Sequence, residues 1–340
     1  MDLLEQLCRA SGVSGFEGSV ADIMKRELKK TCDEVSQDSF GNVIGRKGKG
    51  KNKIMLVAHM DEIGLVVKHV TKEGFLHFVK VGGIDDRVLV GQRVVVKAKK
   101  GDFTGVIGYK PPHLLQQDEM KKAIKHEDLF IDIGATSKKD AEKMVEVGDA
   151  AVFEPNYGVL NKDLHFGKAA DNRLGCYAVI KAMEKLSVKG ATIYAVGSGQ
   201  EEVGLKGARV AAFKLNPDYS IAVDTTLAGD SPGIKETESS LKLGKGPAIT
   251  IMEASGRGVI THPKVKDTMM KAAKAGKIPF QVDILEGGMT DAAIVYLTRE
   301  GIPSGVVSIP TRYIHGPTAV FSMADVNNAI KLTVETVKNL

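Results

Sequence analysis

The sequence predicts an α/β protein of three layers, in which helices cover both faces of a mixed sheet. A small β-rich domain is inserted into the chain of this α/β domain. Strand-like apolar runs alternate with segments of helical periodicity up to residue 61 and again after about residue 162, as is typical of layered α/β domains. Between these parts, short alternating strands follow one another through Gly-containing turns. We therefore expect one domain formed by 1–61 and 162–340, and an inserted domain at 62–161.

The N-terminal part is expected to contain two helices followed by two strands. Apolar residues at helical spacing predict helices over Leu3–Ala10 and Val20–Lys30. Strands are expected at Asn42–Gly45 and Ile54–Ala58, around a lysine-rich turn. In the insertion, hairpins and a short helix are predicted. The ranges are Leu65–Val70, Phe75–Val81, Arg93–Ala98 and Phe103–Tyr109 for the strands, and Ser137–Val145 for the helix.

After residue 161, strands and helices alternate again. Ser322, with Asp325 three residues later, resembles a capping box that opens the last helix. The predicted strands are Thr192–Val196, Ser220–Val223, Ala248–Met252, Phe280–Leu285 and Gly305–Ile309. The predicted helices are Arg173–Leu186, Lys206–Phe213, Lys264–Ala275, Asp291–Arg299 and Ala324–Lys338.

Composition argues against several classes of protein. Of the 340 residues, 43% are apolar and 26% are charged, as in ordinary globular proteins, and no run approaches the roughly 18 apolar residues of a membrane span. The acidic start Met1–Glu5 lacks a signal-peptide layout, so a cytoplasmic location is expected. The net charge of +5 comes from lysine clusters in turns without interleaved aromatics, which argues against nucleic-acid binding. The cysteines lack CxxC spacing and predict neither disulfides nor a thiolate zinc site.

Acids and histidines fall at the ends of apolar runs that are far apart in the chain. They are His59 and Asp61 after 54–58, Glu201 and Glu202 after 191–196, Asp224 after 220–223, His315 after 305–309, and Asp171 at the start of a predicted helix. In an open α/β sheet, functional side chains gather at the carboxyl ends of the strands. One crevice could therefore collect two imidazoles and several carboxylates, a mixture suited to a pair of divalent metal ions.

Each of these residues also has an ordinary structural interpretation. His59 could be a buried histidine whose ring is hydrogen-bonded in the core, and Glu201 and Glu202 could lie on the exposed face of a helix. Asp171 could cap a helix, Asp224 could begin a turn, and His315 could lie on a surface loop. Two local features favour function. Asp61 can orient the His59 ring. Glu201 and Glu202 lie in a Gly-rich elbow, where one carboxylate can bind metal while the other acts as a general base.

Five motifs, in order along the chain, resemble the tetrahedral (TET) aminopeptidases, a family of dinuclear metallopeptidases related to glutamyl and deblocking aminopeptidases. The motifs are His-Met-Asp-Glu at 59–62, Ala-Asp-Asn-Arg at 170–173, Gln-Glu-Glu-Val-Gly-Leu-Lys-Gly-Ala at 200–208, Val-Asp-Thr at 223–225 and Arg-Tyr-Ile-His-Gly-Pro at 312–317. The resemblance covers nearly the whole chain, including the β insertion. It implies a zinc-peptidase-like α/β/α catalytic domain and a β-barrel-like dimerisation domain.

The resemblance also implies a role for each site residue. Asp171 would bridge two metal ions, Zn²⁺ or Co²⁺. The remaining ligands would be His59 and Asp224 for one ion, and Glu202 and His315 for the other. Glu201 matches the general base, and Asp61 matches the residue that supports His59. Family members assemble into dimers through the insertion and then into hollow dodecamers, so self-assembly is expected.

The implied reaction is removal of the N-terminal residue from peptides, by a metal-bridging water that Glu201 activates. The family's Gly-Gly-Thr-Asp loop is interrupted here by Met289, which leaves the role of Asp291 open. The pocket for the substrate side chain is expected to include 255–259 and 287–291. Apart from Arg257, no cationic residue in those stretches hints at acidic substrates. A neutral or apolar residue such as leucine is therefore expected.

Two other functions fit parts of the pattern. Glu201 and Asp61 could be drawn as the carboxylate pair of an endo-β-glucanase. The absence of Trp and an aromatic content of 5% leave little surface for sugar stacking, and such a pair would not need two histidines. A non-catalytic metal-binding assembly protein is the other alternative. It would have no use for Glu201 as a spare base beside an open metal position.

Overall fold

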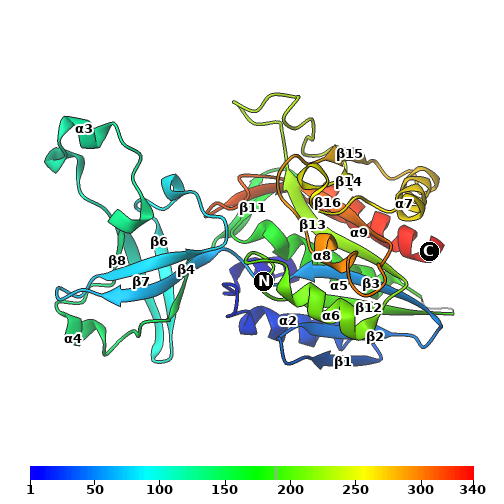
Figure 1. Ribbon diagram of the computed structural model, residues 1–340, viewed down its shortest axis with the longest axis horizontal. Helices are drawn as coiled ribbons and strands as arrows, with labels where there is room; N and C mark the ends of the chain where they lie inside the picture. Colours follow the sequence, from blue (N-terminus) through cyan, green and yellow to red (C-terminus); the bar gives the residue numbers. More distant parts are fainter. Residues whose placement is uncertain (188–189) are drawn as a thin grey trace.

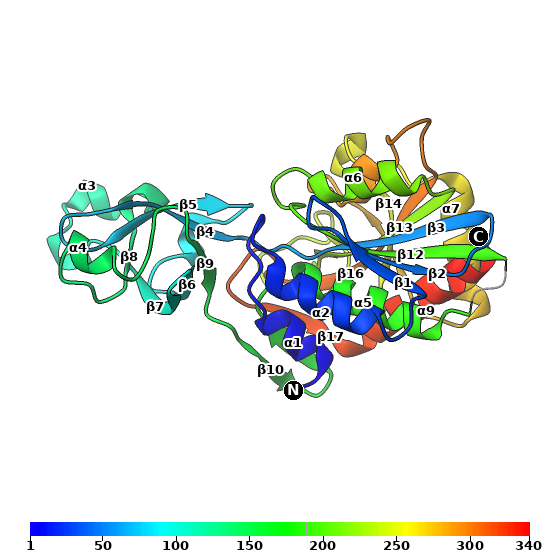
Figure 2. The same ribbon diagram turned by 90° about the horizontal axis from the view of Figure 1, so that it is seen from below.

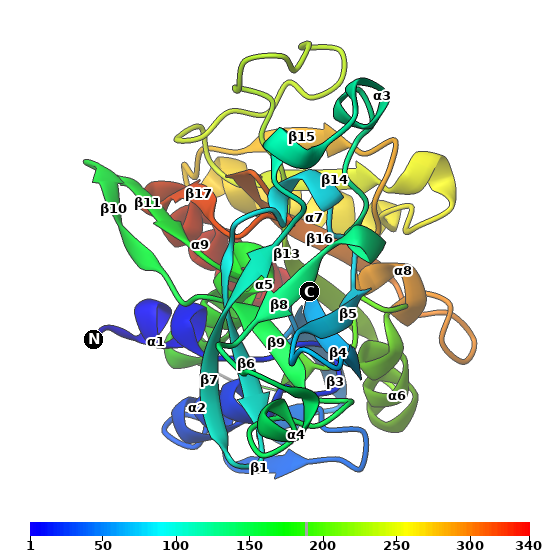
Figure 3. The ribbon, with the colours of Figure 1, turned by 90° about the vertical axis from the view of Figure 1, so that its left-hand side faces the viewer.

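The computed structural model describes residues 1–187 and 190–340 and places them in two parts (Figure 1). A layered α/β domain contains both ends of the chain, and a smaller β-barrel projects from one end of it. Figure 3 views the molecule from the barrel side, with the barrel in front of the large sheet. The predicted class, an α/β/α domain with an inserted barrel-like domain, is confirmed.

The large sheet is mixed and, within the described residues, contains 11 strands. Its central strands are apolar and buried on both sides, as parallel strands under two helical layers must be. Pairing is parallel from β12 through β3 and β13 to β16. In sheet order the main path is β1 (Glu34–Gln37), β2 (Val43–Lys47), β12 (Ala191–Ser198), β3 (Asn52–His59), β13 (Tyr219–Leu227), β16 (Ser304–Arg312), β17 (Ala319–Ser322), β11 (Leu164–Gly167) and β10 (Tyr157–Asn161). Off this path, β14 (Ala248–Met252) joins β16 to β15 (Gln281–Ile284).

Helices cover both faces of this sheet (Figure 2). One face packs against α1 (Leu3–Arg9), α2 (Gly18–Leu28), α5 (Ala170–Lys185), α7 (Pro263–Ala275) and α9 (Met323–Asn339). The other packs against α6 (Lys206–Leu215) and the short α8 (Ala292–Val295). Among the described residues, none of the helices combines the length and apolar character required to cross a bilayer.

Local sequence explains where several helices begin. The predicted cap of the last helix is present, because the Ser322 hydroxyl accepts a 3.2 Å hydrogen bond from the Asp325 N–H. Asp2 caps α1 in the same way, accepting from the Glu5 N–H at 2.8 Å. In α7, Pro263 occupies the first turn, where its missing N–H costs no hydrogen bond.

The insertion folds into a closed barrel with its own apolar core, separate from that of the large domain. The 4 predicted hairpin strands are present with shifts of a residue or two at their ends, and β8 and β9 complete the closure. In barrel order the strands are β4 (Gly64–Val70), β5 (Leu76–Val81), β8 (Phe130–Asp132), β7 (Gly101–Gly108), β6 (Arg93–Ala98) and β9 (Ala150–Phe153). Two short helices, α3 (Gln117–Met120) and α4 (Lys138–Ala141), lie in its connections.

The structure differs from the predicted elements in several places. The helix expected over Ser137–Val145 is only α4. The helix expected over Asp291–Arg299 is only α8, because the chain turns after it and Arg299 adopts a left-handed conformation with φ 57°. The outer strands β1 and β10, the inner strands β11 and β17, and the barrel strands β8 and β9 were not predicted. Each is only three to five residues long, and β1 and β10 carry mixed polar and apolar residues. The hairpin β10–β11 pairs within the large sheet, although residues 157–161 fall in the range expected for the insertion.

Candidate active site

A cavity of about 700 Å³ opens where β3, β12, β13 and β16 approach their carboxyl ends. Six of the seven predicted site residues line it, and they are His59, Asp171, Glu201, Glu202, Asp224 and His315. Asp61 lies behind the cavity wall, fully buried. Strands that are distant in sequence thus deliver their polar ends to one crevice, as the rule for open α/β sheets requires.

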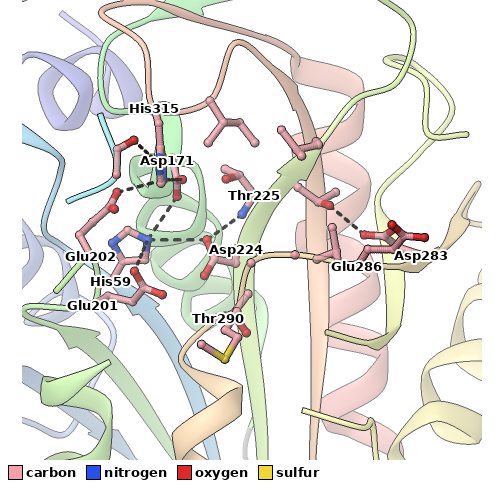
Figure 4. Close-up of a pocket in the computed structure, with 18 of the residues that line it drawn as sticks. His59, Asp171, Glu201, Glu202, Asp224, Thr225, Asp283, Glu286, Thr290 and His315 are labelled. Carbon is pink, nitrogen blue, oxygen red and sulfur yellow. Dashed lines mark hydrogen bonds and ion pairs between the residues drawn. The ribbon is translucent and has the colours of Figure 1, made fainter. Parts of the chain in front are cut away.

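The potential metal ligands form two groups that share Asp171. The first group is His59, Asp171 and Asp224, and the second is Asp171, Glu202 and His315. Within each group, one donor atom per residue lies within 4.8 Å of the others. Figure 4 shows Asp171 between the two imidazoles. His59 Nε2 is 3.2 Å from Asp171 Oδ1, and His315 Nε2 is 3.3 Å from Asp171 Oδ2.

Asp171 is held by the start of α5. The peptide bond between Asp171 and Asn172 is cis, and both residues depart from helical geometry. The Asn172 amide donates to the Val223 carbonyl at 2.9 Å, and this bond ties the helix start to β13 beside Asp224. Gly175 makes this close approach possible, because a Cβ there would lie 2.3 Å from the Val223 carbonyl oxygen. Asp224 itself lies inside β13, which continues to Leu227 beyond its predicted end.

The inserted domain reaches the site through the segment that follows β5. His315, on the loop after β16, has φ 61° and directs Nδ1 to the Gly83 carbonyl at 3.0 Å. Gly83 must be small, since a Cβ there would lie 2.9 Å from the same imidazole nitrogen. The second ring nitrogen therefore faces Asp171 and Glu202, as expected when a carbonyl fixes the orientation of a metal-binding imidazole.

Asp61 organises the elbow that carries the two glutamates. Its carboxylate accepts the N–H of Glu201 at 2.9 Å, the N–H of Glu202 at 3.1 Å and the Ser14 hydroxyl at 2.6 Å. His59 Nδ1 lies 3.2 Å from the Asp61 carbonyl oxygen and 3.5 Å from its carboxylate. Asp61 therefore contacts His59 as predicted, and it also fixes the elbow, a role that the sequence did not reveal.

The two glutamates face the cavity differently. Glu202 Oε1 lies 3.4 Å from His315 Nε2, within the second group of ligands. Glu201 belongs to neither group, and its Oε2 lies 3.9 Å from His59 Nε2. The elbow thus separates one carboxylate beside His315 from one that stands apart from both groups.

Burial and mutual repulsion dominate the electrostatics of the site. Burial raises the pKa of Glu201 and of Asp224 well above the ordinary range. Burial and the nearby Asp171 raise the pKa of Glu202 to about 7. Burial also opposes ionisation of Asp171, but hydrogen bonds from His315 and His59 outweigh it and lower the Asp171 pKa. Burial lowers the pKa of His315, but its bond to Asp171 prevails and raises that pKa to about 9.

These donors fit a pair of divalent cations. Four carboxylates surround two imidazoles in a largely buried crevice, an arrangement that needs positive charge when all four are ionised. The buried Glu202 Oε1 accepts no hydrogen bond from the described residues, so a ligand oxygen is left available. Two imidazole nitrogens and three carboxylates suit Zn²⁺ and related ions.

A buried ion cluster supports the site from behind. Glu62, which follows Asp61, is bound by Lys168 at 2.6 Å and by Arg173 at 3.0 Å, and all three side chains are at most 2% exposed. Gly12 adds a backbone N–H to Glu62 at 2.9 Å. The cluster joins the end of β3 to the start of α5, the two segments that carry His59 and Asp171. Removing one partner of such a cluster costs about 3–5 kcal/mol, because a charge is left buried and uncompensated.

The two loops expected to form the substrate pocket behave differently. Gly287, Gly288, Met289 and Thr290 line the cavity, whereas none of the residues 255–259 does so. Arg257 therefore gives no support for acidic substrates. Asp291 is 1% exposed and lies behind the wall, where one carboxylate oxygen accepts a short hydrogen bond from Ser198. Burial raises its pKa to about 6.

Comparison with known proteins shows the family to which the chain belongs. A family model described as M42 glutamyl aminopeptidase matches residues 41–332. The lysyl aminopeptidase of Pyrococcus furiosus is 36% identical, over 100% of this chain and 97% of its own. A solved aminopeptidase from the archaeon Desulfurococcus kamchatkensis is 40% identical with a TM-score of 0.95, covering 99% of this chain and 94% of that one.

Another similar protein of known structure forms large assemblies. The TET1 peptidase of Pyrococcus horikoshii, which can assemble into a tetrahedron or a large octahedral shell, is 36% identical. Its TM-score is 0.88, and the match covers 98% of this chain and 97% of that one. Since the family model and these relatives each span most of the chain, the protein belongs to the M42 aminopeptidase family and is a peptide hydrolase.

Proposed function

We propose that the protein removes N-terminal residues from peptides with the help of two divalent metal ions and with Glu201 as general base. The observation that carries the proposal is the pair of ligand groups that share Asp171, with Glu201 beside them and outside both. A structural metal site has no use for such a spare carboxylate.

M42 peptidases are metal-dependent, and the residues that line the cavity include two candidate groups of ligands. We assign His59 and Asp224 to one ion, Glu202 and His315 to the other, and Asp171 to both. Zn²⁺ and Co²⁺ are both compatible with nitrogen and carboxylate ligands. When bound, such ions polarise the scissile carbonyl and make a water molecule acidic enough to attack it.

Glu201 then performs the proton transfers. Its largely buried carboxylate accepts a proton from the attacking water and returns that proton to the amine of the leaving peptide. Burial raises the Glu201 pKa, which makes the protonated state between these two steps accessible. The Asp61 carboxylate fixes the Glu201 backbone at 2.9 Å and so keeps this base in place.

The glycoside hydrolase alternative fits the site poorly. Its acid and base would be Glu201 and Asp61, which must flank a sugar ring. Asp61 is fully buried, lies outside the cavity lining and is engaged by Ser14 and two backbone N–H groups. It cannot reach a polysaccharide chain without leaving these partners.

Assembly belongs to the same proposal. We infer that the barrel, which lies within the expected insertion 62–161 and ends before β10, is a dimerisation domain between the two parts of the large domain, and that dimers combine into a tetrahedral dodecamer in the cytoplasm. Support comes from the closed barrel, which has its own core, and from the shells that the TET1 relative forms. The mass of the intact protein, measured by light scattering during gel filtration, tests this inference.

The function is tested by metal removal and restoration. Protein dialysed against a chelator should lose the ability to release p-nitroaniline from amino-acid p-nitroanilides, and Zn²⁺ or Co²⁺ should restore it. A leucyl substrate is the first choice, since the sequence predicts an apolar preference and Leu285 and Met289 lie in the cavity wall. A peptide with a blocked amino terminus is the control and should stay intact. Chelator-insensitive cleavage of a cellulose-type substrate would instead support the alternative.

A further inference from the structure

The cavity extends beyond the metal ligands into a second region with its own chemistry. Three carboxylates line that region, and they belong to Glu238, Asp283 and Glu286. Figure 4 shows Asp283 and Glu286 on the opposite side of the view from His59 and Asp171. Among the described residues, no Lys or Arg lines the cavity.

In the part of the chain that the structure describes, these three carboxylates have no cationic partner. None of them forms an ion pair with a Lys or Arg of the described residues, whereas the nearby Asp230 binds Arg312 at 2.7 Å. Glu238 accepts a backbone N–H from Lys235 at 2.7 Å, and the Asp283 carboxylate accepts the Thr226 hydroxyl at 2.8 Å. Asp283 is only 8% exposed, so its charge sits in a poorly hydrated place. Burying a carboxylate there without a cation is costly.

The distance from the metal ligands to Asp283 suits a long side chain. Thr226, which binds Asp283, lies two residues after Asp224 on β13. Two residues along a strand span about 7 Å. A substrate whose first residue begins at Asp224 must therefore extend by about this length to reach the carboxylate.

Apolar side chains also line the cavity. Leu227 is 52% exposed, Ile284 is 59% exposed and Met289 is 48% exposed, and all three border the cavity. They can contact the aliphatic part of a substrate side chain. Lysine and arginine combine such an apolar stem with a cationic end.

We propose that the protein prefers peptides that begin with lysine or arginine, and that Asp283, Glu286 and Glu238 receive the cationic end. This inference rests on the proposed aminopeptidase function and specifies its substrate. It replaces leucine as the favoured residue, since leucine is too short to meet the carboxylates and leaves them unpaired. Glutamate and aspartate are disfavoured, because like charges repel across the same cavity.

The test compares two substrates that differ in one charged group. Lysyl and norleucyl p-nitroanilides share a four-carbon stem, and only the lysyl compound carries the terminal ammonium. We expect kcat/KM for lysyl to exceed that for norleucyl by at least about tenfold, as a hydrogen bond to a charged partner predicts. The double variant Glu238→Gln, Glu286→Gln should lower this ratio, because kcat/KM for the lysyl substrate should fall by a larger factor than kcat/KM for the norleucyl substrate. Asp283→Asn should lower it further.

Glu236→Gln is the matched control, because Glu236 is exposed on the same segment as Glu238 and does not line the cavity. The ratio of kcat/KM for the lysyl substrate to kcat/KM for the norleucyl substrate should be the same in this variant as in the wild type. A wild-type ratio near one, or equal losses on both substrates in the double variant, would overturn the inference while the aminopeptidase function stands. If the metal-loaded protein cleaves no aminoacyl p-nitroanilide, the proposed function and the inference fail together.

Discussion

The backbone N–H of Glu201 donates a 2.9 Å hydrogen bond to the carboxylate of Asp61, 140 residues earlier in the chain. Through this bond the end of β3, which carries His59, fixes the elbow after β12, which carries Glu201. The proposed base and one proposed metal ligand are thus held by the same buried carboxylate. Rigid placement of this kind matters because a catalytic group displaced by about 1 Å can lose on the order of a hundredfold in rate.

Replacing Glu201 with Gln should separate catalysis from metal binding. The change keeps the size of the side chain and removes the base, so kcat should fall by at least about 100-fold. Metal content measured by inductively coupled plasma mass spectrometry and the far-ultraviolet circular dichroism spectrum should match the wild type. Full activity with the metal bound would exclude Glu201 from the proposed role.

Replacing Asp61 with Asn should disturb the elbow although the shape of the side chain is kept. Both oxygens of Asp61 accept hydrogen bonds, so an amide NH₂ must face the N–H of Glu201 or of Glu202. We expect a loss of roughly 1–3 kcal/mol in the free energy of unfolding, together with a lower kcat. Ser14→Ala, which removes one donor and leaves the carboxylate in place, should have the smaller effect on kcat. Equal stability and rate for Asp61→Asn and the wild type would contradict this account.

The shared ligand predicts a graded loss of metal. Asp171 belongs to both groups and Asp224 to one. After dialysis, Asp224→Asn should retain one ion per chain and Asp171→Asn fewer than one, because a neutral amide is a poorer metal ligand than a carboxylate. The stoichiometry is measured by mass spectrometry on folded protein. Two ions retained by Asp171→Asn would refute the bridging role.

A surface-proximal ion pair gives a pH dependence of stability. The Arg312 guanidinium, which binds Asp230 at 2.7 Å and 2.8 Å, lowers the pKa of that carboxyl. A carboxyl group whose pKa is lower in the folded protein stabilises the fold at pH values above its pKa in the unfolded chain, which is about 3.9. This stabilisation is lost as the pH falls through the pKa of the folded protein. The partly exposed pair should contribute roughly 1 kcal/mol.

Urea unfolding of the wild type and of Asp230→Asn at several pH values tests whether the stabilisation by this ion pair decreases on acidification. The difference in unfolding free energy should be constant from about pH 7 to pH 5 and should shrink below about pH 4. Asp22→Asn is a suitable control, because the Asp22 side chain is 75% exposed and pairs only across one helical turn with Lys25. A difference that grows on acidification would contradict the assigned cause.

Local sequence patterns predicted where most of the secondary-structure elements lie along the chain and which residues belong to the site. Buried strands such as β3 and β14 were predicted within two residues, because their apolar runs are bounded by turn residues. The resemblance named seven site residues, and the structure brings six of them to one cavity with Asp61 directly behind it. The edge strand β10 escaped prediction, because its mixed side chains carry no periodic signal.

The contacts that hold the site residues in place could not be predicted from the sequence. Arg173 was part of a quoted motif, yet its pairing with Glu62 joins residues 111 positions apart. Ser14 showed no sign that it would donate to Asp61. The second carboxylate region was missed for the same reason, since Asp283 reads as one polar residue in a short strand.

The sequence by itself determined most of the strands and helices and the polar residues at their ends, because periodicity and turn chemistry act over a few neighbouring residues. Only the tertiary structure decided which of those ends meet, that Asp61 supports the glutamate elbow, and that the cavity continues to Glu238, Asp283 and Glu286. These relationships depend on how strands from distant parts of the chain pair and twist. That packing buries some carboxylates beside cations and leaves others facing the space a substrate would fill.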